Sequence, residues 1–334
     1  MQFIEQSRRP QTPMSFLPYI LFLIGFPLLI KGADLLVDGA SSIARRAHVS
    51  DLVIGLTVVA FGTSSPELFV NIISSLKGNT DIAIANVLGS NIANILLILG
   101  IASFIYPLSV SQGTVYKEIP LALLAAVMAG ILVNDQWIDG TASSILTRID
   151  GLVLLAFFSI FLYYSFSIAK TIKGMEEHIP SKQYSLLKSV GLVLLGLVGL
   201  ILGGKWIVDG AVHMALRLGL SQSLVGVTVV AIGTSLPELA TSAVAAARKN
   251  VEIAVGNVVG SNIFNVFFVL GISSVIKPIP FNLRNNLDMG VGVLAGLLLF
   301  ICMFTGQRRS LDRWEGCILV GLYLCYMGVV AIQG

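Results

Sequence analysis

Two glutamates interrupt long apolar stretches at equivalent places in the chain. Glu67 lies in the segment GLTVVAFGTSSPELF, and Glu238 lies in GVTVVAIGTSLPELA. A charged side chain at the centre of a membrane helix costs at least about 2.5–3.5 kcal/mol, so each carboxylate needs a reason to be there. If the two side chains meet, their combined charge matches one divalent cation, and without a cation they repel each other or take up protons.

Other oxygen donors accompany each glutamate at helical spacing. The positions i, i+3, i+4 and i+7 share one face of a helix. The two sets are Ala60, Thr63, Ser64 and Glu67 in the first copy and Ala231, Thr234, Ser235 and Glu238 in the second. Pro66 and Pro237 cannot donate to the carbonyls four residues earlier. A local kink with free backbone carbonyls is therefore predicted beside each glutamate.

A second segment in each copy adds amide and hydroxyl groups. Its members are Asn86, Ser90 and Asn94, repeated as Asn257, Ser261 and Asn265. These oxygens suit calcium or sodium, whereas soft ligands for zinc or copper are missing. Hydrogen bonding between helices is the alternative use of the asparagines, above all at Asn86, Asn91, Asn257 and Asn262. Gly89 and Gly260 are expected to be close-packing positions rather than ligands.

The two copies form an internal repeat. Residues 55–100 align without a gap on residues 226–271, half of the aligned positions are identical, and Val37-Asp38-Gly39-Ala40 falls on Val208-Asp209-Gly210-Ala211 at the same offset. With five spans in each half, the second half enters the membrane from the opposite face. The halves are then inverted, and their matching segments converge near the bilayer midplane, as expected of secondary transporters.

Composition explains what positions these residues. Of 334 residues, 55% are hydrophobic and only 12% are charged, against roughly a quarter charged in soluble domains. A spanning helix needs about 20 mostly apolar residues. Ten stretches qualify, at 16–42, 52–76, 82–106, 118–134, 151–170, 187–214, 223–247, 253–277, 286–305 and 314–332. The sequence therefore predicts an all-α membrane protein with ten transmembrane helices as two inverted five-helix repeats.

The domain limits and the orientation follow from these spans. We expect an N-terminal tail (1–15), a first repeat (16–170), a cytoplasmic connection (171–186) and a second repeat (187–334). Lys and Arg number twelve on one side of the spans and seven on the other, which places the first side in the cytoplasm and both termini outside. Asp34, Asp38 and Asp209 are expected near a membrane face, at helix ends or in a gating region.

The repeats resemble the signature segments of the calcium/cation antiporter superfamily, specifically prokaryotic sodium/calcium exchangers. The shared motifs are Gly-Thr-Ser-x-Pro-Glu on one helix and Gly-Ser-Asn-x-x-Asn on the next. The resemblance implies four central cation sites, three for sodium and one for calcium. Calcium would bind Glu67, Glu238 and the backbone oxygens of Thr63 and Thr234. Sodium would use those glutamates, Ser64, Ser90, Ser235, Ser261 and the carbonyls of Ala60 and Ala231, with Asn94 and Asn265 completing the centre.

The resemblance also implies a prokaryotic inner-membrane protein that exchanges sodium for calcium by alternating access. Calcium/proton exchange and potassium-dependent exchange are the alternatives within the superfamily. Some relatives have aspartate at the position of Asn265, which accompanies potassium dependence or proton binding, so asparagine argues against both. A passive cation channel is a rival of another class, disfavoured because the polar groups concentrate at the midplane.

No other chemistry is expected. The sequence has no His-Glu-x-x-His motif, and no enzyme activity, cofactor or obligatory protein partner is predicted. The net charge of +3 is small, so nucleic acid is not an expected partner. The expected partners are the transported calcium and sodium ions and the lipid bilayer.

Overall fold

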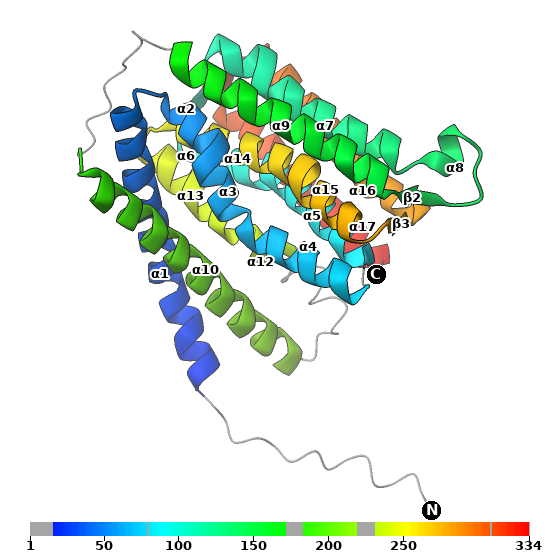
Figure 1. The fold of residues 1–334 in the computed structure, drawn as a ribbon. Helices are drawn as coiled ribbons and strands as arrows, with labels where there is room; N and C mark the ends of the chain where they lie inside the picture. The colour runs from blue at the N-terminus through cyan, green and yellow to red at the C-terminus, as the bar shows by residue number, and fades with distance from the viewer. Residues whose placement is uncertain (1–15, 79, 172–182, 219–230, 308, 334) are drawn as a thin grey trace, which may run out of the picture.

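The computed structural model describes all residues except 1–15, 79, 172–182, 219–230, 308 and 334 (Figure 1). Within the described ranges, eight helices are long and apolar enough to cross a membrane, and a helix pair bent by 46° forms a ninth span. The predicted span 223–247 begins among residues outside these ranges, and its described part is α12 (Ala231–Thr234) and α13 (Leu236–Ala247). The protein is a multi-pass, all-helical membrane protein of two inverted repeats.

The helices of the first half are α1 (Leu17–Ala47), α2 (Asp51–Ile54), the π-helical turn η1 (Gly55–Val59), α3 (Ala60–Thr63), α4 (Ser65–Lys77), α5 (Thr80–Ile92), the π-helical turn η2 (Ala93–Leu99), α6 (Gly100–Ile105), the π-helical turn η3 (Thr114–Glu118), α7 (Ile119–Leu132), α8 (Asp135–Ile138) and α9 (Arg148–Thr171). Those of the second half, besides α12 and α13, are α10 (Leu186–Arg217), α14 (Val251–Ile263), the π-helical turn η5 (Phe264–Leu270), α15 (Gly271–Ile276), the 3-10 turn η6 (Leu283–Asn285), α16 (Asn286–Cys302) and α17 (Arg313–Gln333).

Two short strand pairs join the halves at the ends of the bundle. The strands are β1 (Leu108–Ser109), β2 (Ser144–Leu146), β3 (Ile279–Phe281) and β4 (Ser310–Leu311). β1 pairs antiparallel with β4, and β2 pairs antiparallel with β3. β1 and β3 occupy equivalent places in the repeat, and a single span, α7, separates β1 from β2. The same contact is therefore made once at each membrane face, as inversion requires. Pairs this short were not predicted.

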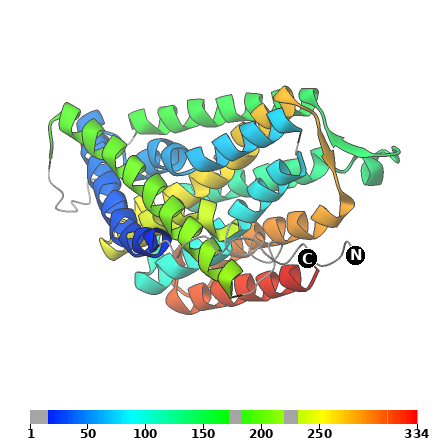
Figure 2. The same cartoon turned by 90° about the horizontal axis from the view of Figure 1, so that it is seen from below.

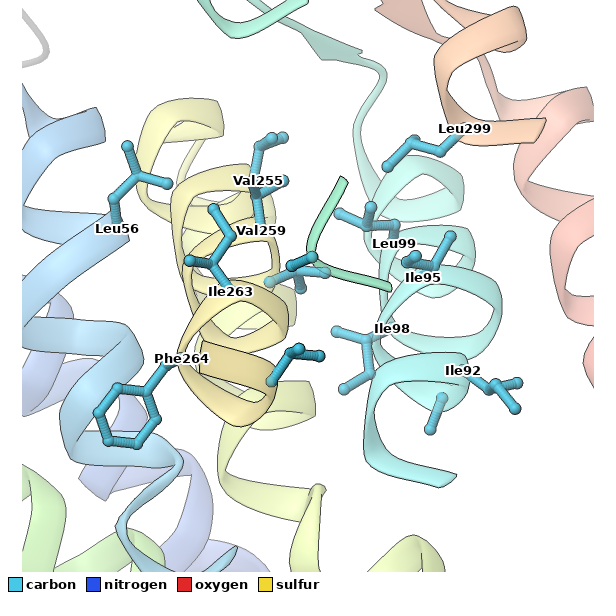
Figure 3. Packing of buried hydrophobic residues seen from close by; sticks show 14 of the residues in the cluster. Leu56, Ile92, Ile95, Ile98, Leu99, Val255, Val259, Ile263, Phe264 and Leu299 are labelled. Atoms are coloured by element: carbon cyan, nitrogen blue, oxygen red, sulfur yellow. The ribbon is translucent and has the colours of Figure 1, made fainter. Parts of the chain in front are cut away.

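Two continuous helices form the centre of the fold. The share of buried residues in the apolar stretch is 72% for the span Ile82–Ile105, which contains most of α5 and all of η2. It is 78% for Val251–Ile276, which contains α14 and η5, against 22–33% for the other six long helices. Figure 3 shows their apolar side chains from close by, with Val255, Val259 and Ile263 on one helix and Ile92, Ile95, Ile98 and Leu99 on the other. These two helices carry the predicted amide and serine ligands.

The pair α1 and α10 crosses at one side of the bundle, as Figures 1 and 2 show. Glycines make the crossing close. A Cβ atom added at Gly32 would lie 2.7 Å from the backbone nitrogen of Leu200, and one added at Gly196 would lie 2.6 Å from that of Leu36. Small residues of this kind let membrane helices approach backbone to backbone.

An ion pair connects α1 to the helix that carries Glu238. Arg248 follows the last residue of α13, and its Nη2 lies 2.6 Å from Oδ1 of Asp34, while its Nη1 contacts Oδ1 of Asp38. The repeat equivalents of Arg248 and Asp38 are Lys77 and Asp209. In the part of the chain that the structure describes, these two residues form no ion pair. The two halves are therefore not arranged identically around the centre.

Candidate cation site

The helices that carry the glutamates break just before them. α3 ends at Thr63 and α4 begins at Ser65, with Ser64 between them outside helical geometry (φ −83°, ψ 6°), and Ser235 breaks the second copy in the same way (φ −88°, ψ 5°). The prolines stand in the first turn of the new helix, where their missing N–H is not needed. Each helix is therefore interrupted at a serine, and in the first half the two segments are bent by 46°, as the predicted kink requires.

This break places both glutamates at helix starts. Glu67 lies in the first turn of α4, and Glu238 lies in the first turn of α13. The partial positive charge at a helix N-terminus stabilises a nearby anion, which partly offsets the burial of a carboxylate. The sequence pattern did not predict this feature, although a proline just before each glutamate was the available signal.

The structure brings the two glutamates and their serines together across the halves. Glu67 is 0% exposed and Glu238 is 1% exposed. Ser64 Oγ lies 2.8 Å from Oε1 of Glu238 and 2.9 Å from Oγ of Ser261. Ser90 Oγ lies 3.4 Å from Oε1 of Glu67. Residues far apart in sequence therefore share one buried centre.

Many oxygens of this centre have no hydrogen-bond partner. Among the described residues, twelve buried side-chain N or O atoms are unpartnered, and six of them belong to predicted site residues. The six are Glu67 Oε2, Glu238 Oε2, Asn94 Oδ1, Asn265 Oδ1, Thr234 Oγ1 and Ser235 Oγ. Leaving one such group buried without a partner costs about 1–3 kcal/mol. The carboxylate and amide carbonyl oxygens can only accept hydrogen bonds. A bound cation would therefore satisfy them, whereas another acceptor group would not.

Threonine and backbone groups surround this centre. Thr63 Oγ1 lies 3.0 Å from Oδ1 of Asn257 and 3.1 Å from the carbonyl of Val59. The Ala60 carbonyl accepts from the backbone N–H of Ser64 at 3.0 Å. The equivalent Ala231 is the first residue of α12. Thus the structure places the backbone of both alanines one turn before the helix break.

Asn86 and Asn257 hold helices together. Asn86 Nδ2 donates to Oδ1 of Asn71 at 2.7 Å, and Asn257 Nδ2 donates to Oγ of Ser242 at 3.0 Å and to the backbone carbonyl of Glu238 at 3.3 Å. The structure therefore shows these two asparagines in the alternative role, hydrogen bonding between helices. Sequence reasoning missed Asn71 and Ser242, although each stands four residues after its glutamate and so on the same helix face.

Asn94 and Asn265 lie inside π-helical turns. η2 contains Asn94 and η5 contains Asn265, and π-helical turns occur often at functional sites. Gly260 packs closely, as expected: a Cβ there would lie 2.6 Å from the carbonyl oxygen of Leu56. At Gly89 no described residue comes within 4 Å of the Cβ position; Val227, the repeat equivalent of Leu56, lies outside the described residues, so close packing at Gly89 stays a prediction.

Comparisons with known proteins agree with this architecture. The family model described as "Sodium/calcium exchanger protein" matches residues 17–167 and 188–332. The inner membrane protein YrbG of Escherichia coli is 34% identical over 321 residues, covering 93% of this chain and 95% of YrbG. The sodium/calcium exchanger MaX1 of Methanosarcina acetivorans is 29% identical over 344 residues, covering 93% and 98%.

A solved structure shows the same fold. A crystal of the sodium-calcium exchanger NCX_Mj soaked with sodium and calcium ions matches with a TM-score of 0.80 and 35% identity, covering 94% of this chain and 99% of that one. The family model covers nearly all of both halves, and the relatives match along almost their whole length. The chain is a transporter rather than an enzyme, and it belongs to the sodium/calcium exchanger family of cation exchangers.

Proposed function

We propose that this protein is a secondary active antiporter that exchanges sodium for calcium across the prokaryotic inner membrane. The main support is the cluster of unpartnered acceptor oxygens around two buried carboxylates, which suits hard cations such as calcium and sodium. MaX1 is described as a sodium/calcium exchanger, and the NCX_Mj crystals were soaked with sodium and calcium or strontium. Both relatives point to the same pair of ions.

The proposed ligands come from both halves, 16–170 and 187–334. Glu67 and Glu238 bind calcium, assisted by the backbone oxygens of Thr63 and Thr234. Sodium binds to the same carboxylates through ligands that replace or extend this set: Ser64, Ser90, Ser235, Ser261 and the carbonyls of Ala60 and Ala231, with Asn94 and Asn265 at the centre. Because the carboxylates are shared, calcium and sodium compete, and only one kind of ion is carried at a time.

Exchange rather than leak follows from the charge of the empty site. Two ionised carboxylates in a closed, dry intermediate are costly, so the protein changes face only when cations neutralise them. Alternating access then couples the two ions. The ion pairs of Arg248 with Asp34 and Asp38, which have no counterpart at Lys77 and Asp209, support a state in which one face is held closed. In the proposed orientation, with both termini outside, this is the cytoplasmic face.

Arg248→Ala is expected to shift the balance between the two faces. Without the guanidinium, Asp34 and Asp38 lose their bridge to α13 and the cytoplasmic face opens more often. The apparent calcium affinity should then rise about threefold to tenfold at the cytoplasmic side and fall by a similar factor outside. Calcium uptake in vesicles of each orientation measures both values.

The control for this prediction is Arg248→Lys, which keeps the charge and should change each affinity less than the alanine variant does. An equal loss of affinity at both sides of the membrane would contradict the gating role of Arg248. It would indicate damage to the ion site or to the fold instead.

Uptake of radiolabelled calcium tests the proposed function. Purified protein is reconstituted in sodium-loaded liposomes and diluted into sodium-free buffer, in parallel with lithium-loaded, potassium-loaded and pH-jump samples. Uptake only from sodium-loaded vesicles is expected. Uptake driven by the pH jump alone would show calcium/proton exchange, and a requirement for potassium together with sodium would show potassium-dependent exchange. Uptake without any ion gradient would show a channel.

A further inference from the structure

We infer that Asn91 and Asn262, which are not among the proposed ligands, are positioning residues that orient the amide groups of Asn94 and Asn265 for cation binding. This inference rests on the proposed function and deepens it. All four asparagines are buried: Asn91 is 8% exposed, Asn262 4%, Asn94 1% and Asn265 0%. They come in equal numbers from the two central helices and meet between the halves.

Two backbone contacts fix the orientation of the outer amides. Asn91 Nδ2 donates to the backbone carbonyl of Asn262, and Asn262 Nδ2 donates to the backbone carbonyl of Asn91, each at 3.3 Å. The nitrogen and oxygen of an asparagine amide are normally assigned from its hydrogen bonds. Here the choice is settled, because a backbone carbonyl only accepts and the group facing it must be the donor.

The orientation of the inner amides follows from the outer ones. Because the Nδ2 atoms of Asn91 and Asn262 donate to these backbone carbonyls, the Oδ1 atom of each amide remains as an acceptor. Asn265 Nδ2 donates to Oδ1 of Asn91 at 3.1 Å, and Asn94 Nδ2 donates to Oδ1 of Asn262 at 2.9 Å. The amide oxygens of the inner pair, Oδ1 of Asn94 and Oδ1 of Asn265, are buried and have no hydrogen-bond partner. Two backbone carbonyls therefore decide the direction of all four side chains.

This direction matters for cation binding. An amide that presents Oδ1 can bind a cation, whereas the same amide turned over presents an NH2 group that repels it. Free rotation of Asn94 and Asn265 would make each one a ligand for only part of the time. A satisfied buried network holds such groups in one arrangement. Asn91 and Asn262 thus keep two neutral oxygens ready without adding charge to the two glutamates.

The test is a mutant cycle read as calcium affinity. Asn262→Ala is expected to raise the KM for sodium-driven calcium uptake, and the dissociation constant for calcium in detergent, about tenfold. In a background that carries Asn94→Ala and Asn265→Ala, the same substitution should add less than about twofold, because Asn94, the amide that Asn262 positions, is gone. A residue that only stabilised the fold would weaken binding equally in both backgrounds.

The matched control is Asn71→Ser. Asn71 also bonds to a central helix through a buried amide, and serine copies its repeat equivalent Ser242, which still accepts from an asparagine. Its calcium affinity should stay within about twofold of the wild type. If the wild type transports calcium but Asn262→Ala has the same effect in both backgrounds, the positioning role is overturned and the proposed function is not. Absence of sodium-driven uptake in the wild type would instead overturn the proposed function.

Discussion

Glu67→Gln and Glu238→Gln are each expected to abolish sodium-driven calcium uptake. Glutamine has the same shape as glutamate but removes one of the two charges that balance a divalent cation. Removing one partner of a buried charge pair costs about 3–5 kcal/mol, which corresponds to a loss of affinity of more than about 100-fold. Initial rates of radiolabelled calcium uptake in sodium-loaded liposomes measure the effect, and calcium binding in detergent shows whether affinity is the cause.

The chain offers a matched control for this experiment. Glu118 is also buried, at 1% exposure; its Oε1 accepts from Tyr164, and its Oε2 has no partner. It belongs to η3 and not to the central helices. Glu118→Gln therefore removes a buried carboxylate outside the proposed site and should leave calcium uptake measurable. Uptake at the wild-type rate in both Glu67→Gln and Glu238→Gln would contradict the proposed calcium site.

The sequence was sufficient to predict which residues converge. The gap-free repeat places Gly-Thr-Ser-x-Pro-Glu and Gly-Ser-Asn-x-x-Asn twice in the chain, and inversion brings both copies to the midplane. The contacts of Ser64 with Glu238 and Ser261 are of this kind. Long apolar stretches likewise predicted the spans, because a helix that satisfies its own backbone is the only single segment that can cross a bilayer.

The sequence was not sufficient to predict which amide faces which partner. Spacing placed Asn86, Ser90 and Asn94 on one helix face, yet Asn86 bonds to Asn71 on α4, whereas Asn94 bonds to Asn262 in the other half. An ideal α-helical repeat does not describe the face of this helix from η2 onward, because a π-helical turn widens the helix there. Nothing in the composition of residues 93–99 marks such a turn.

The sequence likewise did not predict the long-range ion pairs of Arg248. Asp34 and Asp38 were expected near a membrane face, but their partner Arg248 lies more than two hundred positions away in the chain. Lys77 is basic at the position equivalent to Arg248, but it forms no such ion pair among the described residues. Lys205 stands at the repeat equivalent of Asp34, so the second copy has one carboxylate fewer at this place and cannot form the same pair of contacts.

Gly196→Leu is expected to prevent correct packing of α1 against α10. A Cβ atom at this position would lie 2.6 Å from the backbone nitrogen of Leu36 and 2.8 Å from the carbonyl oxygen of Gly32. Backbone atoms cannot move aside as a flexible side chain can, so the two helices must separate. Overpacking costs about 1–3 kcal/mol of stability and occasionally more. A leucine side chain that meets backbone atoms should give a loss at the upper end of this range. Yield after size-exclusion chromatography and the thermal midpoint measure the loss.

Gly191→Leu is the control for this prediction. It shows whether leucine harms α10 in general or only where its side chain clashes with the backbone of α1. Gly191 lies on α10 as well, but no described atom comes within 4 Å of its Cβ position, and a larger apolar side chain there should leave folding and uptake near those of the wild type. Because α1 carries Asp34 and Asp38, its displacement by Gly196→Leu should also weaken their contact with Arg248. If Gly196→Leu folded and transported calcium as well as Gly191→Leu, α1 and α10 could not cross at Gly32 and Gly196 in the membrane.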